Sequence, residues 1–584
     1  MLRITKKLFQ ILNTRQKQFV IVLVFMMLLG GIMESLSVSL ILPLITAVMD
    51  TKTWNGKWYA QLLCSIFNIS DQRQYVSVLL ILLIIVFVLK NVYLIVEYRI
   101  QYNFIGKCRY DMQAGLIHSY IRKPYTFYLS ANFGEIIRII NSDVTEAFNL
   151  LTGVLLFYTE IIVSIVLGIT IIVMSPMMAF GIIIILLVEL LVIAVIIKPV
   201  MQRTGEGQRN ESALSNKWLL QSLNGIKSIK VANKEDYFED NFKEHARKSV
   251  RLAAKYQTLY NLPRLLIEAF TVAGVLFIML ILVLNGMDLA SLVPQLSAFV
   301  IAAIRLLPSV NRISTSINQV PFYEGGLDNI IRVIKDEDVL ESSSSEIEFA
   351  GWKNQTFRNF TFNENIAFKD VSFSYPQNDK RILDYTRFKI HAGESVGIIG
   401  SSGSGKTTTV DIMLGLLSPS SGSVSVDGDD INDNLPAWLS HLAYIPQSIF
   451  LMDDTIRANV AFGIDRSKMS DEKVWESLRE AQLEDFVRGL PEGIDTTIGE
   501  QGVRLSGGQR QRIGIARALY NDPEILFFDE ATSALDNETE KAIMESIENL
   551  KGRKTLVIIA HRLTTIENCD VVYKVENGKI IKER

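Results

Sequence analysis

The stretch Gly400-Ser-Ser-Gly-Ser-Gly-Lys406-Thr407 decides the fold of the C-terminal half of the chain. It fits G-x-x-x-x-G-K-[ST], the phosphate-loop pattern in which backbone N–H groups converge on the α- and β-phosphates of a nucleotide. In such a loop Lys406 reaches the β- and γ-phosphates, and the Thr407 hydroxyl can bind Mg²⁺. The apolar run Val396-Gly-Ile-Ile399 predicts a strand before the loop, and a helical pattern follows from Thr408 to Leu417. The stretch therefore predicts a nucleotide site rather than a chance turn rich in glycine and serine.

A second apolar run ends in two acids. Ile525-Leu-Phe-Phe-Asp529 predicts a buried parallel strand, and Glu530 follows it directly. An aspartate at the end of a strand beside a phosphate loop is placed to hold Mg²⁺ through water, and the adjacent glutamate can polarise the attacking water. Either acid alone could merely end a strand. Together with the phosphate loop, they predict a site of nucleotide hydrolysis.

The N-terminal half is dominated by apolar runs of membrane-spanning length, since roughly 20 helical residues cross about 30 Å of hydrocarbon. Six such runs exceed what the core of a soluble domain would hold, so we predict six membrane spans. They lie near residues 19–49, 75–97, 147–174, 178–200, 263–285 and 291–308.

The charge and length of the loops predict the orientation of these spans. The N-terminal head is basic, so the positive-inside rule keeps it in the cytoplasm, and six spans return the chain there after residue 308. Runs three and four, and five and six, are joined by a few residues, whereas long stretches rich in Arg and Lys join runs two and three, and runs four and five. We expect these long stretches to be cytoplasmic helical hairpins. The external segment Trp58–Phe67 is expected to form a short amphipathic helix on the outer surface.

Length and composition narrow the class of protein. The 584 residues are about twice what one hydrophobic core sustains, so more than one domain is expected. A net charge of -3 disfavours nucleic acid as a partner, and the three distant cysteines support neither a disulfide framework nor a zinc site. We predict a polytopic α-helical membrane domain with six transmembrane helices fused to an α/β phosphate-loop domain. The expected ranges are 1–325 for the membrane domain, 326–352 for a serine-rich linker and 353–584 for the ATP-binding domain.

The pentapeptide Leu505-Ser-Gly-Gly-Gln509 matches the signature of the ABC transporter family, which the whole chain resembles. Other matches follow in the order of that family: Tyr375 for adenine stacking, Gln447 in the loop facing the membrane domain, Ser533-Ala-Leu-Asp536, and His561 as the γ-phosphate sensor. The segment Thr497–Gly502 is similar to an exporter-specific loop. Six spans followed by one ATPase domain resemble a half-transporter of the exporter type.

The resemblance implies a site with ATP and Mg²⁺ as cofactors. It implies catalytic roles for Glu530, His561 and Gln447, and metal binding by Thr407, Gln447 and Asp529. In this family the phosphate loop of one chain faces the signature of another, so we expect a homodimer, with a homologous partner as the alternative. The residues implied to bind ATP are Tyr375, Gly400, Ser401, Ser402, Gly403, Ser404, Gly405, Lys406, Thr407, Thr408, Ser506, Gly507, Gly508 and Gln509.

Charged residues within the apolar runs bear on the substrate, because an unpaired charge there costs at least about 2.5 to 3.5 kcal/mol. Arginines in such places can bind phosphate, although Arg264 and Glu268 lie four residues apart and could neutralise each other. The segments 262–268 and 305–312 are similar to bacterial lipid-linked oligosaccharide flippases. The charged residues in question are Glu34, Lys90, Glu160, Glu189, Arg264, Glu268 and Arg305.

The resemblance to flippases implies ATP-driven movement of a polyprenyl-pyrophosphate-linked oligosaccharide across the cell membrane, in contact with membrane lipids and by alternating access. Arg264 and Arg305 are the expected substrate contacts. A multidrug or lipid A-type exporter is the alternative, because it would share every ATPase motif. An ATP-gated channel or a regulatory ABC protein is the alternative of another class.

Overall fold

The structure is a computed structural model, and it describes residues 1–40, 43–44, 47–48, 58–69, 71–174, 191, 193–284, 289–337, 361–375, 380–499, 502–529, 545, 547–560 and 566–584. These form two compact units. The helical unit comprises Met1–Lys123 and Asn132–Glu348, and the α/β unit comprises Pro124–Ala131 and Phe349–Arg584. Of the expected linker, residues 326–337 are helical and residues 338–352 lie outside the described residues.

The α/β unit is built on a six-stranded sheet with strand order β10-β9-β3-β8-β7-β6. The expected strands at 396–399 and 525–529 are confirmed as β3 and β7, and β3, β6, β7, β8 and β9 run parallel. The strand bounds are β3 Ser395–Ile399, β6 Leu442–Ile445, β7 Ile525–Asp529, β8 Thr555–Ile559, β9 Val571–Glu576 and β10 Lys579–Lys582. An antiparallel sheet of order β2-β1-β4-β5 accompanies it: β1 Asn365–Ser374, β2 Arg381–His391, β4 Ser421–Val426 and β5 Asp429–Asp430.

Helices cover both faces of the six-stranded sheet. Alternate side chains of β7 enter two different hydrophobic clusters, because successive residues of a strand point to opposite faces. Ile525 and Phe527 lie in the cluster that contains α15, Lys406–Met413, whereas Leu526 and Phe528 lie in the cluster that contains α20, Gly507–Leu519. These two helices therefore cover opposite faces. The remaining helices are α6 Tyr125–Tyr128, η4 Ile431–Asn434, α16 Leu435–Ser440, α17 Ile456–Val460, η5 Arg466–Lys468, α18 Asp471–Glu480, α19 Glu484–Arg488 and η6 Gly493–Asp495.

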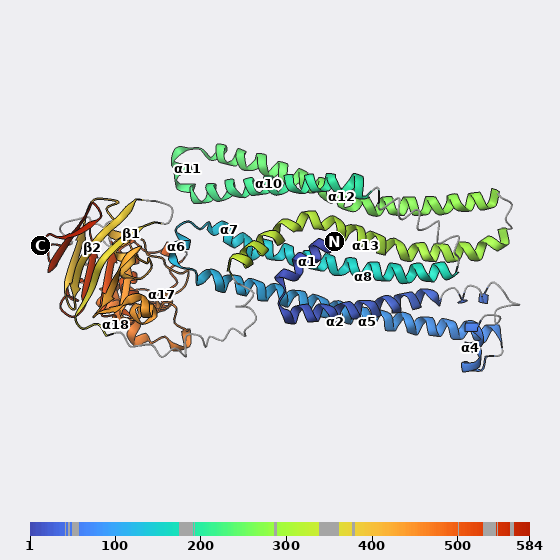
Figure 1. Ribbon diagram of the computed structural model, residues 1–584, viewed down its shortest axis with the longest axis horizontal. Helices are drawn as coiled ribbons and strands as arrows, with labels where there is room; N and C mark the ends of the chain where they lie inside the picture. Colours follow the sequence, from blue (N-terminus) through green and yellow to red (C-terminus); the bar gives the residue numbers. More distant parts are fainter. Residues whose placement is uncertain are drawn as a thin grey trace. The chain divides into compact units, whose positions relative to one another are not determined.

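The helical unit consists of long helices that run side by side (Figure 1). α10 packs along α12, to which α11 connects it, α13 packs along α8, and α2 contacts both α5 and α8. The bounds are α1 Leu2–Ile11, α2 Thr14–Ser39, α4 Trp58–Phe67, α5 Gln72–Ile121, α7 Phe133–Arg138, η1 Ile139–Asp143, α8 Val144–Met174, η2 Ile193–Ile197, α10 Lys198–Asn224, α11 Ile226–Ala232, α12 Glu235–Leu284 and α13 Leu289–Glu337.

The helix lengths agree with spans that continue beyond the bilayer. α5 has 50 residues, which corresponds to about 75 Å at 1.5 Å per residue, more than twice the thickness of the hydrocarbon. α4 coincides with the helix expected at Trp58–Phe67. Within the described ranges, three helical segments are long and apolar enough to cross a membrane: Thr14–Glu34, Gln72–Ile121 and Phe133–Val166. The expected count of six is not confirmed, and most of the predicted run 178–200 lies outside the described residues.

Among the ion pairs that join neighbouring helices of this unit, two involve charges of the apolar runs. The Nζ atom of Lys90 on α5 lies 3.8 Å from Oε1 of Glu34 on α2. Arg312 on α13 donates a hydrogen bond to the carboxylate of Glu160 on α8, whose side chain is only 4% exposed. Three of the charges found in the apolar runs, Glu34, Lys90 and Glu160, are therefore paired within the chain. No pattern in the sequence predicts Arg312 as the partner of Glu160.

We expect Arg312→Ala to lower the free energy of unfolding by about 3 to 5 kcal/mol, because it leaves the Glu160 carboxylate buried without its cation. Thermal unfolding in detergent measures the effect. Arg332→Ala removes an exposed arginine from the same helix and serves as the control. The double variant Glu160→Ala, Arg312→Ala should recover much of the loss, and an equally unstable double variant would contradict the pairing.

Candidate nucleotide site

The phosphate loop connects the end of β3 to the first turn of α15. Gly400, Gly403 and Gly405 have positive φ angles of 155°, 75° and 107°. A Cβ atom at Gly400 would lie 2.5 Å from the carbonyl oxygen of Val575, so that position excludes a side chain. Positive φ values and absent side chains let the loop turn its backbone N–H groups toward a ligand. The predicted helix begins at Lys406, slightly earlier than the sequence pattern indicates.

Lys406 is 5% exposed and lies over this loop. Its Nζ atom donates hydrogen bonds to the carbonyl oxygens of Gly400, at 3.0 Å, and Ser401, at 3.1 Å. The ammonium group is therefore held beside the peptide groups that would surround the phosphates of a nucleotide. Such a position suits a cation that binds the β- and γ-phosphates.

Two buried acids lie beside the loop. Asp529 ends β7 and accepts a hydrogen bond of 3.1 Å from the hydroxyl of Tyr444 on β6. Asp411 on α15 is 8% exposed, and burial raises its pKa to about 6, with the neighbouring charge of Asp529 adding to the rise. Burial and the charge of Asp529 also raise the pKa of Tyr444. Buried carboxylate oxygens next to a phosphate loop are suitable ligands for Mg²⁺, so the residues fit that ion.

Two tyrosines border the same cluster. The hydroxyl of Tyr375 lies 3.1 Å from Oγ1 of Thr408, which places the predicted adenine platform next to the loop. Tyr125 on α6 lies close to Asp411 and Tyr375. Burial raises the pKa of Tyr125, and the charges of these two neighbours raise it further. Tyr125 is not predicted from the sequence, because no motif contains it and it lies far along the chain from the other residues of the cluster.

The signature begins the helix on the opposite face of the sheet. Ser506 caps α20 by a reciprocal arrangement: its hydroxyl accepts a hydrogen bond from the N–H of Gln509, and Gln509 Oε1 accepts one from the N–H of Ser506. Gly507 has open space where a Cβ would lie. Among the residues that the structure describes, no hydrogen bond joins the signature to the phosphate loop. The cap leaves the start of α20 ordered and accessible.

Arg517 connects α20 to the segment that follows Gln447. Gln447 is exposed, just after the end of β6. The Arg517 guanidinium donates to the carbonyl oxygens of Phe450, at 2.7 Å, and Asn459, at 2.8 Å, and burial lowers its pKa to about 10. A Cβ at Gly514 would come within 2.1 Å of Ile449, so α20 approaches this segment closely. A movement of the signature helix would therefore be transmitted toward Gln447.

Several predicted site residues lie outside the described residues: Glu530, Ser533–Asp536 and His561. Arg264 lies on α12 and Arg305 on α13, but their side chains are also outside what the structure describes.

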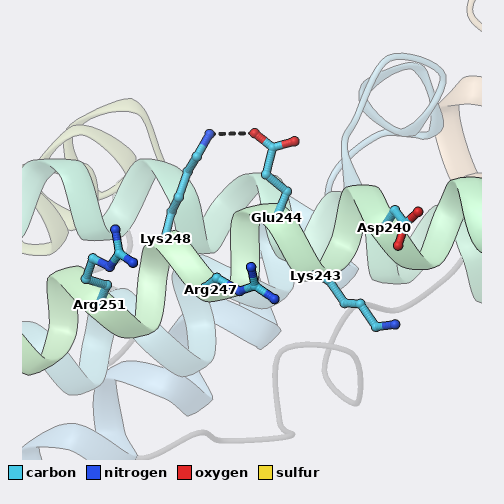
Figure 2. Close-up of a pocket in the computed structure, with 6 residues that line it drawn as sticks. All are labelled: Asp240, Lys243, Glu244, Arg247, Lys248 and Arg251. Atoms are coloured by element: carbon cyan, nitrogen blue, oxygen red, sulfur yellow. Dashed lines mark hydrogen bonds and ion pairs between the residues drawn. The ribbon is translucent and has the colours of Figure 1, made fainter.

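Outside the α/β unit, α12 carries a concave surface of about 430 Å³ (Figure 2). The Nζ atom of Lys248 lies 2.6 Å from a carboxylate oxygen of Glu244, so part of its charge is compensated within the helix. All six lining residues are ionisable: Asp240, Lys243, Glu244, Arg247, Lys248 and Arg251. Such a surface, formed by one face of a single helix, is typical of a solvated charged helix rather than a nucleotide site.

Comparison with known families finds two matches. The family model described as ABC transporter matches residues 383–533, and the one described as ABC transporter transmembrane region matches residues 20–303. The range 383–533 contains the phosphate loop and the signature. The range 20–303 contains most of the apolar runs.

Individual relatives agree with these matches. The chain is 31% identical over 483 residues to the ATP-dependent lipid A-core flippase of Dechloromonas aromatica, covering 82% of this chain and 79% of the flippase. The lipid A-core flippase of Desulfotalea psychrophila is 36% identical, but that match spans 64% of this chain and 63% of the relative. The corresponding match in Saccharophagus degradans covers 59% of the relative.

A solved structure supports the fold of the whole chain. The structure of a bacterial Atm1-family ABC exporter with ATP bound superimposes with a TM-score of 0.71. It covers 97% of this chain and 95% of that exporter at 22% sequence identity, so the likeness concerns the fold.

The raised pKa of Asp411 predicts a pH dependence of stability. A folded-state pKa of about 6, above the ordinary 3.8, means that the folded state binds the proton more tightly than the unfolded chain. The free energy of unfolding should therefore fall as pH rises from about 4 to about 6. Asp411→Asn should flatten this dependence in urea unfolding of the metal-free, nucleotide-free protein. Asp433→Asn, at an exposed position, is the control, and an unchanged slope in the Asp411 variant would reject the assignment.

Proposed function

The chain belongs to the ABC transporter family, and on that premise we propose that it is an ATP-driven exporter or flippase for an amphipathic substrate. The observation that carries the proposal is the grouping of Lys406, Asp411, Tyr444 and Asp529 around a glycine-rich loop in which Gly400 leaves no room for a side chain. This cluster provides backbone donors and a cation for phosphates, and buried acids for a metal ion.

Each residue has a definite role in the proposed hydrolysis of ATP. The loop amides and Lys406 bind the phosphates, and Tyr375 positions the adenine. Thr407, Asp529 and Gln447 would hold Mg²⁺, which when bound neutralises phosphate charge. Glu530 polarises the attacking water, and His561 contacts the γ-phosphate.

A second copy of the chain completes the proposed site. The phosphate loop and the signature lie at the ends of helices that cover opposite faces of one sheet, so each favours a partner on another molecule. We infer a homodimer in which ATP lies between the loop of one copy and the signature of the other; a heterodimer with a homologue is the alternative. ATP closes the dimer and hydrolysis reopens it, which gives alternating access in the membrane domain.

The proposed location is the cell membrane, with the N-terminus and the ATPase domain in the cytoplasm. The basic head of the chain and the long basic helical hairpins support this orientation. The domain ranges 1–325, 326–352 and 353–584 are proposed with it.

We infer that the substrate is a glycolipid. Relatives named lipid A-core flippases favour a lipid A-type molecule at least as well as the polyprenyl-pyrophosphate-linked oligosaccharide. Both substrates join a lipid, anionic phosphate and sugars, and both would suit cationic contacts such as Arg264 and Arg305. A gated channel or a regulatory protein would not require ATP turnover to be coupled to a substrate. Coupled ATP turnover therefore distinguishes a flippase from these two classes.

We expect Glu530→Gln to retain ATP binding while losing about 10²- to 10⁴-fold in turnover, because the amide cannot act as a base toward water. ATP hydrolysis and nucleotide binding by the detergent-solubilised protein measure the two effects separately. Glu524→Gln changes an exposed acid at the other end of the same strand and should leave turnover unchanged. Wild-type turnover in the Glu530 variant would contradict the proposed role.

Reconstitution in liposomes tests the substrate. ATP-dependent movement of a fluorescent polyprenyl-pyrophosphate glycan and of a fluorescent lipid A-core should be compared, and movement of neither would reject a glycolipid flippase. If Arg264 grips phosphate, Arg264→Ala should slow movement, and the double variant Arg264→Ala, Glu268→Ala should stay slow although its stability returns. Full recovery of movement in the double variant would show that Arg264 only balances Glu268.

A further inference from the structure

The helical unit contains a cavity of about 410 Å³ between α10, α12 and α13. This volume lies in the range of ordinary small-ligand sites. α10 contributes Gln208, α12 contributes Tyr256, Gln257 and Tyr260, and α13 contributes Gln319 and Phe322. No step of the proposed ATP hydrolysis uses these residues.

The lining indicates an uncharged, polar ligand. Of the described residues that line the cavity, none is an acid or a base, in contrast to the surface in Figure 2. A glutamine amide both donates and accepts hydrogen bonds, and so does a hydroxyl group. A tyrosine ring presents an apolar face and a polar tip. The combination matches a sugar ring, which has apolar C–H faces and a rim of hydroxyl groups.

Packing holds the aromatic side of this cavity in place before any ligand binds. The rings of Tyr256 and Phe322 lie 5.0 Å apart, and the Tyr256 and Tyr260 rings lie 6.5 Å apart with 28° between their planes. Gln319 Nε2 donates a hydrogen bond of 3.3 Å to the Tyr260 hydroxyl. The Arg209 guanidinium lies 5.1 Å from the centre of the Phe322 ring. A ligand would therefore meet an aromatic surface that does not need to be assembled.

The amides of Gln208 and Gln257 complete the site. Within the described part of the chain, neither side chain makes a hydrogen bond to another residue, so both can turn toward a ligand. Gln208 lies on the helix that leaves the apolar run 178–200, and Gln257 precedes the run 263–285. At 1.5 Å per residue, Gln208 lies about 12 Å beyond its run, outside the hydrocarbon but within reach of a lipid's head group.

We infer that this cavity binds the uncharged sugar portion of the lipid substrate on the cytoplasmic side, before transport. The inference rests on the proposed function for the orientation of the spans and for a glycolipid substrate. It adds a subsite that recognises sugar hydroxyls, separate from any contact that arginines make with phosphate. It is compatible with both substrate classes, since each carries sugars.

Saturation-transfer NMR on the full chain in lipid nanodiscs, without nucleotide, tests the site. The probes are the neutral disaccharides maltose and N,N′-diacetylchitobiose. At least one of them should receive saturation, and the double variant Gln208→Ala, Gln257→Ala should weaken its binding at least about fivefold. Gln202→Ala is the matched control, because Gln202 lies on the same helix, donates to Glu206 and does not line the cavity.

Absence of saturation transfer to both sugars would overturn the inference, as would an equal loss in the Gln202 variant. Stronger competition by inorganic pyrophosphate than by the sugars would also overturn it, because it would assign the cavity to anions. ATP hydrolysis by the same samples separates this test from the proposed function. Sugar binding without hydrolysis would reject the transporter activity but keep the site, whereas hydrolysis without sugar binding would reject only the site.

Discussion

The tight turn from β3 into α15 is the constraint on which the rest of the α/β unit depends. Phosphates can approach backbone N–H groups only where no side chain intervenes. At Gly400 a side chain would collide with the carbonyl oxygen of Val575, so only glycine fits that position. The parallel order of β3, β8, β7 and β6 then brings the end of β7 to the same edge of the sheet. There Asp529 and Asp411 are buried beside the partly buried Tyr444, and the mutual repulsion of the two acids favours binding of a cation.

The same sheet separates the two motifs that a nucleotide would have to contact. Because α15 and α20 cover opposite faces, the ordered cap at Ser506 is available to another molecule rather than to its own phosphate loop. Arg517 ties α20 to the segment after Gln447 through carbonyl oxygens, which connects the signature helix to the chain that follows β6. In the helical unit, ion pairs such as that of Glu160 with Arg312 neutralise buried charge, so charge alone does not mark a substrate contact.

Local patterns in the sequence predict those helices, strands and loops whose conformation depends on residues nearby in the chain. The apolar residues of β3 and β7, and the glycines that follow β3, are sufficient to predict the strands, the loop and the helix after it, and the residues of Trp58–Phe67 are sufficient to predict a helix. The partner of Glu160 could not be predicted, because Arg312 is distant in sequence and many other cations were candidates. Tyr125 and the cavity around Tyr256 and Phe322 depend on the packing of separate helices, for which a single sequence carries no pattern. By contrast, Glu530 and His561 are predicted by sequence motifs, but they lie outside the described residues.

The central claim is that each ATP site is composed of two chains, and mixed dimers of differently tagged copies test it most directly. A Lys406→Ala copy paired with a Ser506→Arg copy keeps one composite site intact. A wild-type copy paired with a copy that carries both changes keeps none. The account predicts ATP hydrolysis by the first mixed dimer and little by the second. Hydrolysis by the second and not the first would show that loop and signature act within one chain, and would contradict the account.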